Sequence, residues 1–169
     1  GLLDKADRAG YAVCHRIPER SFTIGGRQLP LCARCSGLYL GAFAGMIALV
    51  ALGRGRGGRF PTRRYALILG LFMLAWAGDG FNSFLALLEL PHLYEPTNRL
   101  RLITGALAGI AIAAVLLPAL NVTFWAAPAD RRSIERPADL LWLLAAAAAV
   151  VLIVLSAADW LLYPLALLS

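Results

Sequence analysis

This chain has very little charge for its length. Only 15% of its 169 residues are Asp, Glu, Lys or Arg, whereas 60% are hydrophobic and the mean hydropathy is +0.70. Soluble domains carry about 25% charged residues, so the composition excludes an ordinary soluble domain. The apolar residues gather in four long stretches, and a membrane-spanning helix needs about 20 such residues. The sequence therefore predicts an all-α membrane protein.

Cysteine and histidine are also scarce, with three and two copies. All three cysteines and His15 fall within residues 14–35, so the residues suited to metal or redox chemistry are concentrated in one short segment. The chain also lacks internal repeats and a glycine-rich phosphate loop. Nothing in the sequence therefore indicates a nucleotide-binding enzyme or a repeat protein.

The sequence divides into two parts. Residues 1–35 form an extramembrane segment that we call the Cys/His knob, and residues 36–169 form a four-helix transmembrane domain. With four spans, the knob, the loop after the second helix and the C-terminus share one side of the membrane. The expected helices cover about 36–52, 65–90, 102–120 and 140–158.

The Cys/His knob is expected to contain a short β-hairpin. Residues 21–24 and 27–31 are strand-like runs separated by Gly25-Gly26, a two-residue hairpin signal. The second run leads directly into a Cys-x-x-Cys motif, whose spacing lets one turn of backbone offer two sulfurs to a metal ion. The hairpin would thus gather four candidate ligands, which are Cys14, His15, Cys32 and Cys35.

Three interpretations of the cysteines stay open. The first is a structural zinc site of the Cys3His type, in which His92, Asp79 or a water replaces His15 if adjacent ligands crowd the ion. The second is a redox-active Cys32/Cys35 pair in a quinone-linked membrane thiol-disulfide oxidoreductase. Such enzymes normally relay electrons through a second pair, which three cysteines cannot supply. The third is free thiols, a simple disulfide or another metal.

Two predicted helices carry glycines at four-residue spacing. Gly37, Gly41 and Gly45 form one face of the first helix, and Gly105 and Gly109 form a similar face on the third. Such faces let two helix backbones approach closely in a membrane. We therefore expect the first and third helices to touch.

Asp79 is the residue most costly to place in a bilayer. Ionisable groups inside a membrane are rare and are paired or functional. Asn82 and Ser83 follow Asp79 on the same helical face, which leads toward the knob. We expect a polar pocket under the knob whose remaining members are Arg34, Arg99, Arg101 and Thr104.

The net charge of +6 follows from arginines that flank the membrane spans, so no nucleic-acid partner is expected. Lys and Arg divide evenly, eight on each side of the membrane. Five arginines between residues 54 and 64 are packed against two helix ends, which favours a cytoplasmic position for that loop. This places the Cys/His knob on the outer side of what the composition suggests is a bacterial cytoplasmic membrane.

Three blocks of the sequence resemble a known family. They are Cys14-His15-x-x-Pro18-x-Arg20-Ser21-Phe22 with Leu31-Cys32-Ala33-Arg34-Cys35-x-Gly37-x-Tyr39-x-Gly41, then Asp79-Gly80, then Thr97-Asn98-x-Leu100-Arg101-x-x-Thr104-Gly105-x-x-x-Gly109. Together they resemble the signature of a family of small prokaryotic integral membrane proteins of unknown function. The resemblance implies a multi-helix membrane protein with a cysteine–histidine site, and it implies no activity.

The expected function is therefore a binding or accessory role, and the residues indicate no particular catalysed reaction. We expect a small membrane protein with a structural metal, most simply zinc, that serves a larger membrane complex. Its partners would be membrane lipid and other protein subunits or further copies of itself. The enzyme alternative is the oxidoreductase, and a transporter that uses Asp79 as an ion site is a third possibility.

Overall fold

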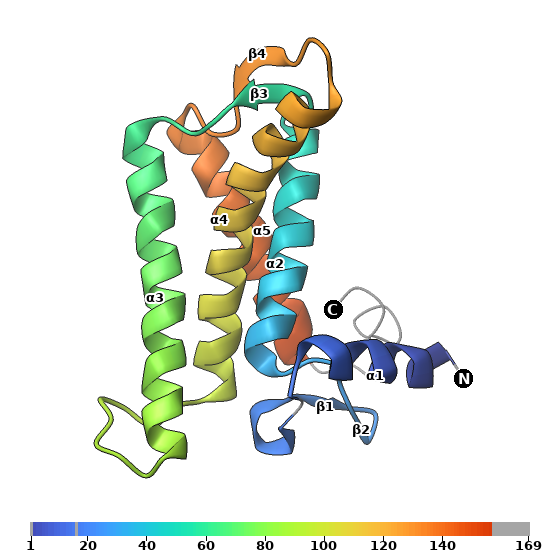
Figure 1. The fold of residues 1–169 in the computed structure, drawn as a ribbon, viewed down its shortest axis with the longest axis vertical. Helices are drawn as coiled ribbons and strands as arrows, with labels where there is room; N and C mark the ends of the chain where they lie inside the picture. The colour runs from blue at the N-terminus through green and yellow to red at the C-terminus, as the bar shows by residue number, and fades with distance from the viewer. Residues whose placement is uncertain (1, 16, 157–169) are drawn as a thin grey trace.

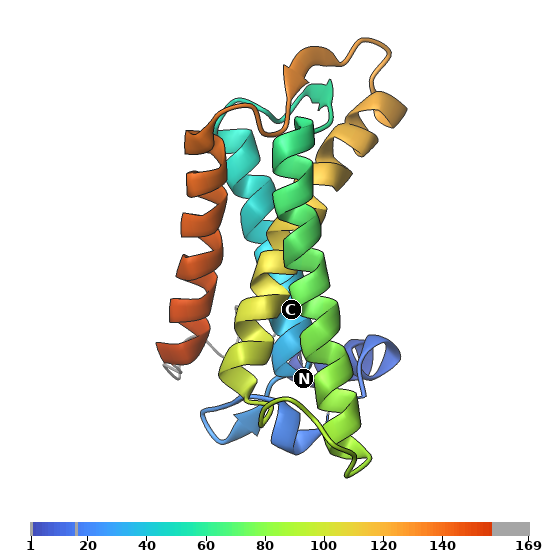
Figure 2. The same ribbon diagram turned by 90° about the vertical axis from the view of Figure 1, so that its left-hand side faces the viewer.

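The structure, a computed structural model, describes residues 2–15 and 17–156 and is dominated by four long helices that run side by side (Figures 1 and 2). All four are long and apolar enough to cross a membrane. This confirms the predicted fold class. The helices are α2 (Ala33–Ala51), α3 (Arg63–Leu87), α4 (Asn98–Phe124) and α5 (Pro137–Ser156).

The helix boundaries differ from the prediction by a few residues. α2 begins at Ala33 rather than at residue 36, which places Cys35 inside its first turn. α3 ends at Leu87 rather than at residue 90, and the chain then turns through Glu89 at a positive φ of 56°. The last two residues of the predicted fourth helix, 157 and 158, lie outside the described residues.

The Cys/His knob lies across one end of the helix bundle. Its first helix, α1 (Leu2–Val13), runs roughly perpendicular to α2 and α4 (Figure 1). The 3-10 helix η1 (Pro18–Arg20) and the hairpin of β1 (Thr23–Ile24) and β2 (Arg27–Gln28) follow. The turn residues Gly25 and Gly26 have φ of 56° and 74°, the left-handed values that a tight hairpin needs. The predicted hairpin is confirmed, with shorter strands.

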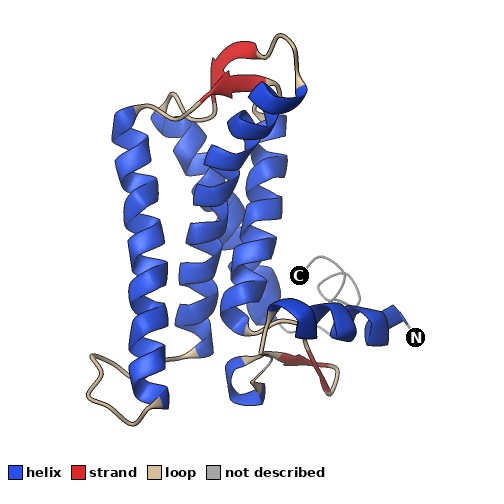
Figure 3. Cartoon of the chain, viewed as in Figure 1, coloured by secondary structure: helices blue, strands red, loops and turns tan. Residues whose placement is uncertain are grey.

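The opposite end of the bundle is more ordered than the sequence indicates. The loops before α3 and after α4 pair in parallel through β3 (Gly57–Arg59) and β4 (Ala129–Arg132), so short strands cap both ends of the bundle (Figure 3). The buried Asn121 donates to the carbonyls of Gly55 and Gly57 at 3.0 Å each. Pairing between loops that are distant in the chain leaves no periodic pattern in the sequence.

Helices α2 and α4 form the centre of the bundle through their glycine faces. A Cβ at Gly41 would lie 2.6 Å from the carbonyl oxygen of Ala106, and one at Gly37 would overlap the carbonyl of Leu102. In return, Cβ atoms at Gly105 and Gly109 would overlap the carbonyls of Arg34 and Leu38. Backbone thus packs on backbone, and the predicted contact between these helices is confirmed.

A small apolar cluster ties the knob to the bundle. Ile24 and Leu29 of the hairpin region are buried against Leu40 of α2, Leu102 of α4 and Val154 of α5. Val154 is near the end of α5, so that end lies on the same side as the knob, as four antiparallel spans require. The knob is therefore attached to the end of the bundle where α2, α4 and α5 pack together.

Substituting Gly41 by Ala should destabilise the bundle, because the new Cβ meets the backbone of α4 rather than a movable side chain. Overpacking of this kind costs about 1–3 kcal/mol. Gly70→Ala on α3 is the matched control, since nothing lies within 4 Å of its Cβ position. Thermal unfolding in detergent should show a lower midpoint for Gly41→Ala only. An unchanged midpoint for Gly41→Ala would contradict the close contact.

Candidate metal centre

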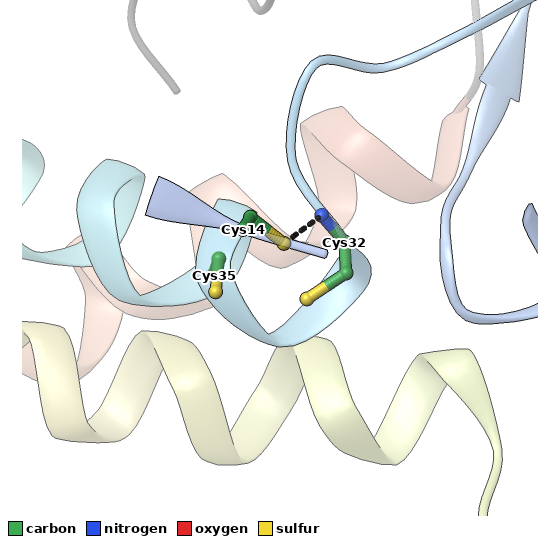
Figure 4. A group of neighbouring side chains, drawn as sticks. All are labelled: Cys14, Cys32 and Cys35. Carbon is green, nitrogen blue, oxygen red and sulfur yellow. Dashed lines mark hydrogen bonds between the residues drawn. The ribbon is translucent and has the colours of Figure 1, made fainter. Parts of the chain in front are cut away.

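Three thiols meet where the knob joins the bundle. Cys14 follows the end of α1, Cys32 immediately precedes α2, and Cys35 lies in the first turn of α2. Their Sγ atoms all lie within 4.8 Å of one another. Figure 4 shows the three side chains at the start of α2, with the backbone N–H of Cys32 donating to Cys14 Sγ at 3.4 Å. The three cysteines are free thiols in this structure.

Two local features bring Cys14 to the other two cysteines. The hairpin reverses the chain between residues 23 and 28, so the segment that follows returns toward α1. Gly10 of α1 then lies directly against the backbone of Pro30, where any Cβ would overlap the Pro30 carbonyl. This close contact positions the end of α1 beside the start of α2. Glycine at position 10 is thus a requirement of the site that the motif pattern did not reveal.

His15 does not join the three thiols in a single group of mutually close ligands. Its side chain is exposed, although it lines the same cavity as the cysteines. Cys14 is buried and His15 is exposed, so these two neighbouring side chains have different environments. Among the described residues, the gathered ligand set is therefore Cys14, Cys32 and Cys35.

The start of α2 favours a thiolate at Cys32. Hydrogen bonds from the Cys35 thiol, from the backbone N–H groups of Cys35 and Arg34, and from Cys14 lower the pKa of Cys32 below its ordinary value, and these outweigh the effect of burial. Free backbone N–H groups at a helix N-terminus stabilise an anion in this way. A thiolate is the form of cysteine that binds metal ions.

The second part of the site surrounds Asp79, which is 3% exposed. Arg34 donates to Asp79 Oδ2 through both Nε, at 3.1 Å, and Nη2. Tyr94 donates its hydroxyl to Oδ1 at 2.9 Å, and Thr104 Oγ1 lies 3.4 Å from Oδ2. Arg34 Nη2 also reaches Ser83 Oγ at 2.9 Å. Asp79 is thus a paired carboxylate between α2, α3 and α4.

Asp79 lies toward the knob-side end of α3. It is about two turns from Leu87, where the helix ends. The loop after α3 folds back over this end. Asn82 holds that loop by donating to the carbonyl of Tyr94 and accepting from the N–H of Leu93, at 2.8 Å each. Tyr94 was missed because its role depends on how this irregular loop returns.

The two arginines at the start of α4 have different environments. Arg101 is buried, donates to Asn98 Oδ1 at 2.8 Å and lines the cavity that contains the cysteines. Arg99 is exposed. Neither is the hydrogen-bonding partner of Asp79, which is Arg34. This corrects the expectation that both would line the pocket, because two positions along a helix turn a side chain by about 200°.

Comparison with known families identifies the chain. A family model described as "Predicted membrane protein (DUF2085)" matches residues 14–115, which is more than half of the protein. The chain belongs to the DUF2085 family. The match begins at Cys14 and includes all three cysteines, Asp79 and Arg101. This confirms the resemblance seen in the sequence and shows a multi-pass membrane protein.

Two archaeal proteins are similar to this DUF2085 chain. The uncharacterized protein MJ1492 of Methanocaldococcus jannaschii is 34% identical over 106 residues, which are 63% of this chain and 62% of that protein. An uncharacterized protein of Methanothermobacter thermautotrophicus is 35% identical over 104 residues, which are 60% of this chain and 81% of that protein. No solved structure matches the chain.

Neither relative's name records an activity, so the comparisons supply no function. The matched region is less than two thirds of MJ1492, and that protein therefore extends beyond what this chain covers. Both relatives are archaeal, which supports a cell membrane without making it specifically bacterial. The composition-based expectation of a bacterial membrane was thus too narrow.

Replacing Asp79 by Asn should strongly destabilise the DUF2085 protein, because it leaves the Arg34 guanidinium without its carboxylate. Breaking a buried pair in this way costs about 3–5 kcal/mol. Glu89→Gln is the control, since that carboxylate is exposed just after α3. Thermal unfolding in detergent should show a much lower midpoint for Asp79→Asn than for Glu89→Gln. The double variant Arg34→Met/Asp79→Leu should recover much of the loss, and no recovery would contradict the pairing as the cause.

Proposed function

We propose that this protein binds one Zn²⁺ through Cys14, Cys32 and Cys35, and that the ion holds the Cys/His knob on the membrane helices. The observation that carries the proposal is the convergence of the three Sγ atoms within 4.8 Å. Zn–S bonds near 2.3 Å in a tetrahedral site place sulfurs about 3.8 Å apart. A small contraction of side chains is enough to form such a site.

The ligand chemistry also fits zinc. Thiolates are soft ligands that favour Zn²⁺, and three of them leave one position of a tetrahedral ion to fill. His15 lines the same cavity and is the candidate for that position after a rotation of its side chain; a water molecule is the other. With His15 bound the site is closed and purely structural.

The knob has a physical need for such a cross-link. Its strands are two residues long, and among the knob side chains that the structure describes only a few large apolar ones are buried, namely Ile24, Leu29 and Leu31. A core of this size gives little folding free energy, and small folds commonly use a metal in its place. An ion bound by the three cysteines would join the end of α1 to the start of α2.

We further propose that the protein acts as a binding or accessory subunit of a larger membrane complex. The support is that the buried carboxylate of Asp79 is used within the fold, because it is satisfied by Arg34, Tyr94 and Thr104. Such a carboxylate suits a structural role better than ion transport. The five arginines between residues 54 and 64 support a cytoplasmic position for the opposite end, with the knob outside.

Elemental analysis of the purified protein tests the metal site. We expect about one Zn²⁺ per chain, and loss of that zinc in the Cys14→Ser, Cys32→Ser and Cys35→Ser variants. His15→Ala should weaken zinc retention against a chelator, whereas His92→Ala, which removes the only other histidine, should not. Lowering the pH should release the ion, since protons compete for the thiolates. Full zinc retention in all three serine variants would refute the proposal.

The second candidate is a thiol-disulfide oxidoreductase, favoured by the lowered pKa of Cys32 beside two further thiols. Oxidation of Cys32 and Cys35 would form one disulfide and pass two electrons and two protons to a quinone, giving the quinol. A thiol count separates the two functions. Three unreactive thiols that become reactive on chelation indicate zinc, whereas one reactive thiol that rises to three on reduction indicates the disulfide.

A further inference from the structure

The cavity that contains the cysteines also has an unusual concentration of arginine. It has a volume of about 390 Å³ and is lined by Arg20 from η1, Arg34 from α2 and Arg101 from α4. These residues are far apart in the sequence, and the fold brings them to one place. Three guanidinium groups repel one another, so their convergence needs a compensating negative charge.

Carboxylates of the fold supply only part of that charge, and the Cys32 thiolate, which lines the same cavity, is the other negative group there. Arg34 is paired with Asp79. Arg20 donates instead to the backbone carbonyl of Ser83 at 3.2 Å, and Arg101 donates to the amide oxygen of Asn98. Within the part of the chain that the structure describes, neither Arg20 nor Arg101 forms an ion pair with a carboxylate.

The lack of a carboxylate partner is clearest at Arg101. Its side chain is one of the few charged groups in the core, with 7% of the residue exposed, and its Nε is buried without a hydrogen-bond partner. Burying an uncompensated charge costs several kcal/mol, so such groups are normally paired. Because Arg101 also lines the cavity, an anionic ligand bound there would supply the negative charge that Arg101 lacks.

Apart from the arginines, the three cysteines and His15, the residues that line the cavity are apolar. Val13, Phe84 and Leu87 line it, and all three are more than half exposed, so apolar surface continues from the arginines to the outside of the bundle. Phe84 and Leu87 belong to the knob-side end of α3. The end of a membrane-spanning helix lies near the boundary between lipid headgroups and acyl chains.

We propose that this cavity binds an anionic phosphate group through Arg20 and Arg101, with Arg34 held in place by Asp79. Arginine forms paired, charge-assisted hydrogen bonds with phosphate oxygens. The same chemistry is available from the headgroup of an anionic phospholipid and from a free phosphate compound. Arginines would bind the phosphate and thiols the metal, so the proposal does not rest on zinc binding, although both sets of side chains line one cavity.

The test measures phosphate and lipid binding by the full-length protein purified in detergent. One arm titrates inorganic phosphate, and the other titrates phosphatidylglycerol with phosphatidylcholine as the neutral reference. The thermal unfolding midpoint and native mass spectrometry report binding, and zinc content is measured in parallel. We expect the wild type to be stabilised by at least one of the two anionic ligands and not by phosphatidylcholine.

Arg101→Gln and Arg20→Gln should each weaken binding about tenfold or more, the effect of losing a hydrogen bond to a charged group. Arg99→Gln is the matched control, because it removes the same charge from an exposed position on the same helix. Arg20→Gln and Arg101→Lys keep the test valid if Arg101→Gln fails to fold. Arg101→Lys keeps the charge and should lose less than Arg20→Gln.

The outcomes of the two titrations distinguish a lipid site from a general phosphate site. Stabilisation by phosphatidylglycerol alone identifies a lipid site, and stabilisation by inorganic phosphate, with competition between the two, identifies a general phosphate site. Either result supports the proposal if substitution of Arg20 or Arg101 weakens binding and Arg99→Gln does not. The absence of any effect on the wild type would overturn it, as would an equal loss in Arg99→Gln, which would reduce the binding to general surface charge.

Discussion

The close contact between α2 and α4 is the constraint on which the rest of the structure depends. Glycine on both faces lets the two backbones touch, so the carbonyls of one helix lie where Cβ atoms would otherwise be. This places Arg34 and Cys35 of α2 next to Thr104 and Arg101 of α4 with little freedom to move. A bulkier contact would separate the helices and disperse both the charged network and the cysteines.

Two buried charged groups at the junction between the knob and the helix bundle, Asp79 and Arg101, differ in their hydrogen bonding. Asp79 is fully satisfied within the fold, because an arginine, a tyrosine and a threonine from three different segments reach its two oxygens. Arg101 is equally buried but retains an unpartnered nitrogen. In a low-dielectric environment the satisfied hydrogen bonds of Asp79 make a rigid network. In the same environment the unpartnered nitrogen of Arg101 is costly unless a ligand pairs with it. The contrast distinguishes a structural pair from a candidate binding group.

The cysteine cluster connects these elements to the knob. The knob is held to the bundle by a few apolar contacts and by hydrogen bonds such as that of Asn98 to the carbonyls of Glu19 and Ser21. A metal at the three thiols would add a strong local cross-link above the arginine cavity. Zinc and an anion would then play separate roles, the first fixing the roof of the cavity and the second balancing its charge.

The sequence by itself determined the four membrane helices, the hairpin and the α2–α4 contact, because hydrophobic length, a Gly-Gly turn and four-residue glycine spacing are local patterns. It also indicated that Cys14, Cys32 and Cys35 converge and that Asp79 needs a partner. Only the tertiary structure decided that Arg34 is that partner, that Tyr94 returns to it from a loop, and that Arg101 is buried while Arg99 is exposed. These outcomes depend on helix rotation and loop return, which follow from packing between segments far apart in the chain.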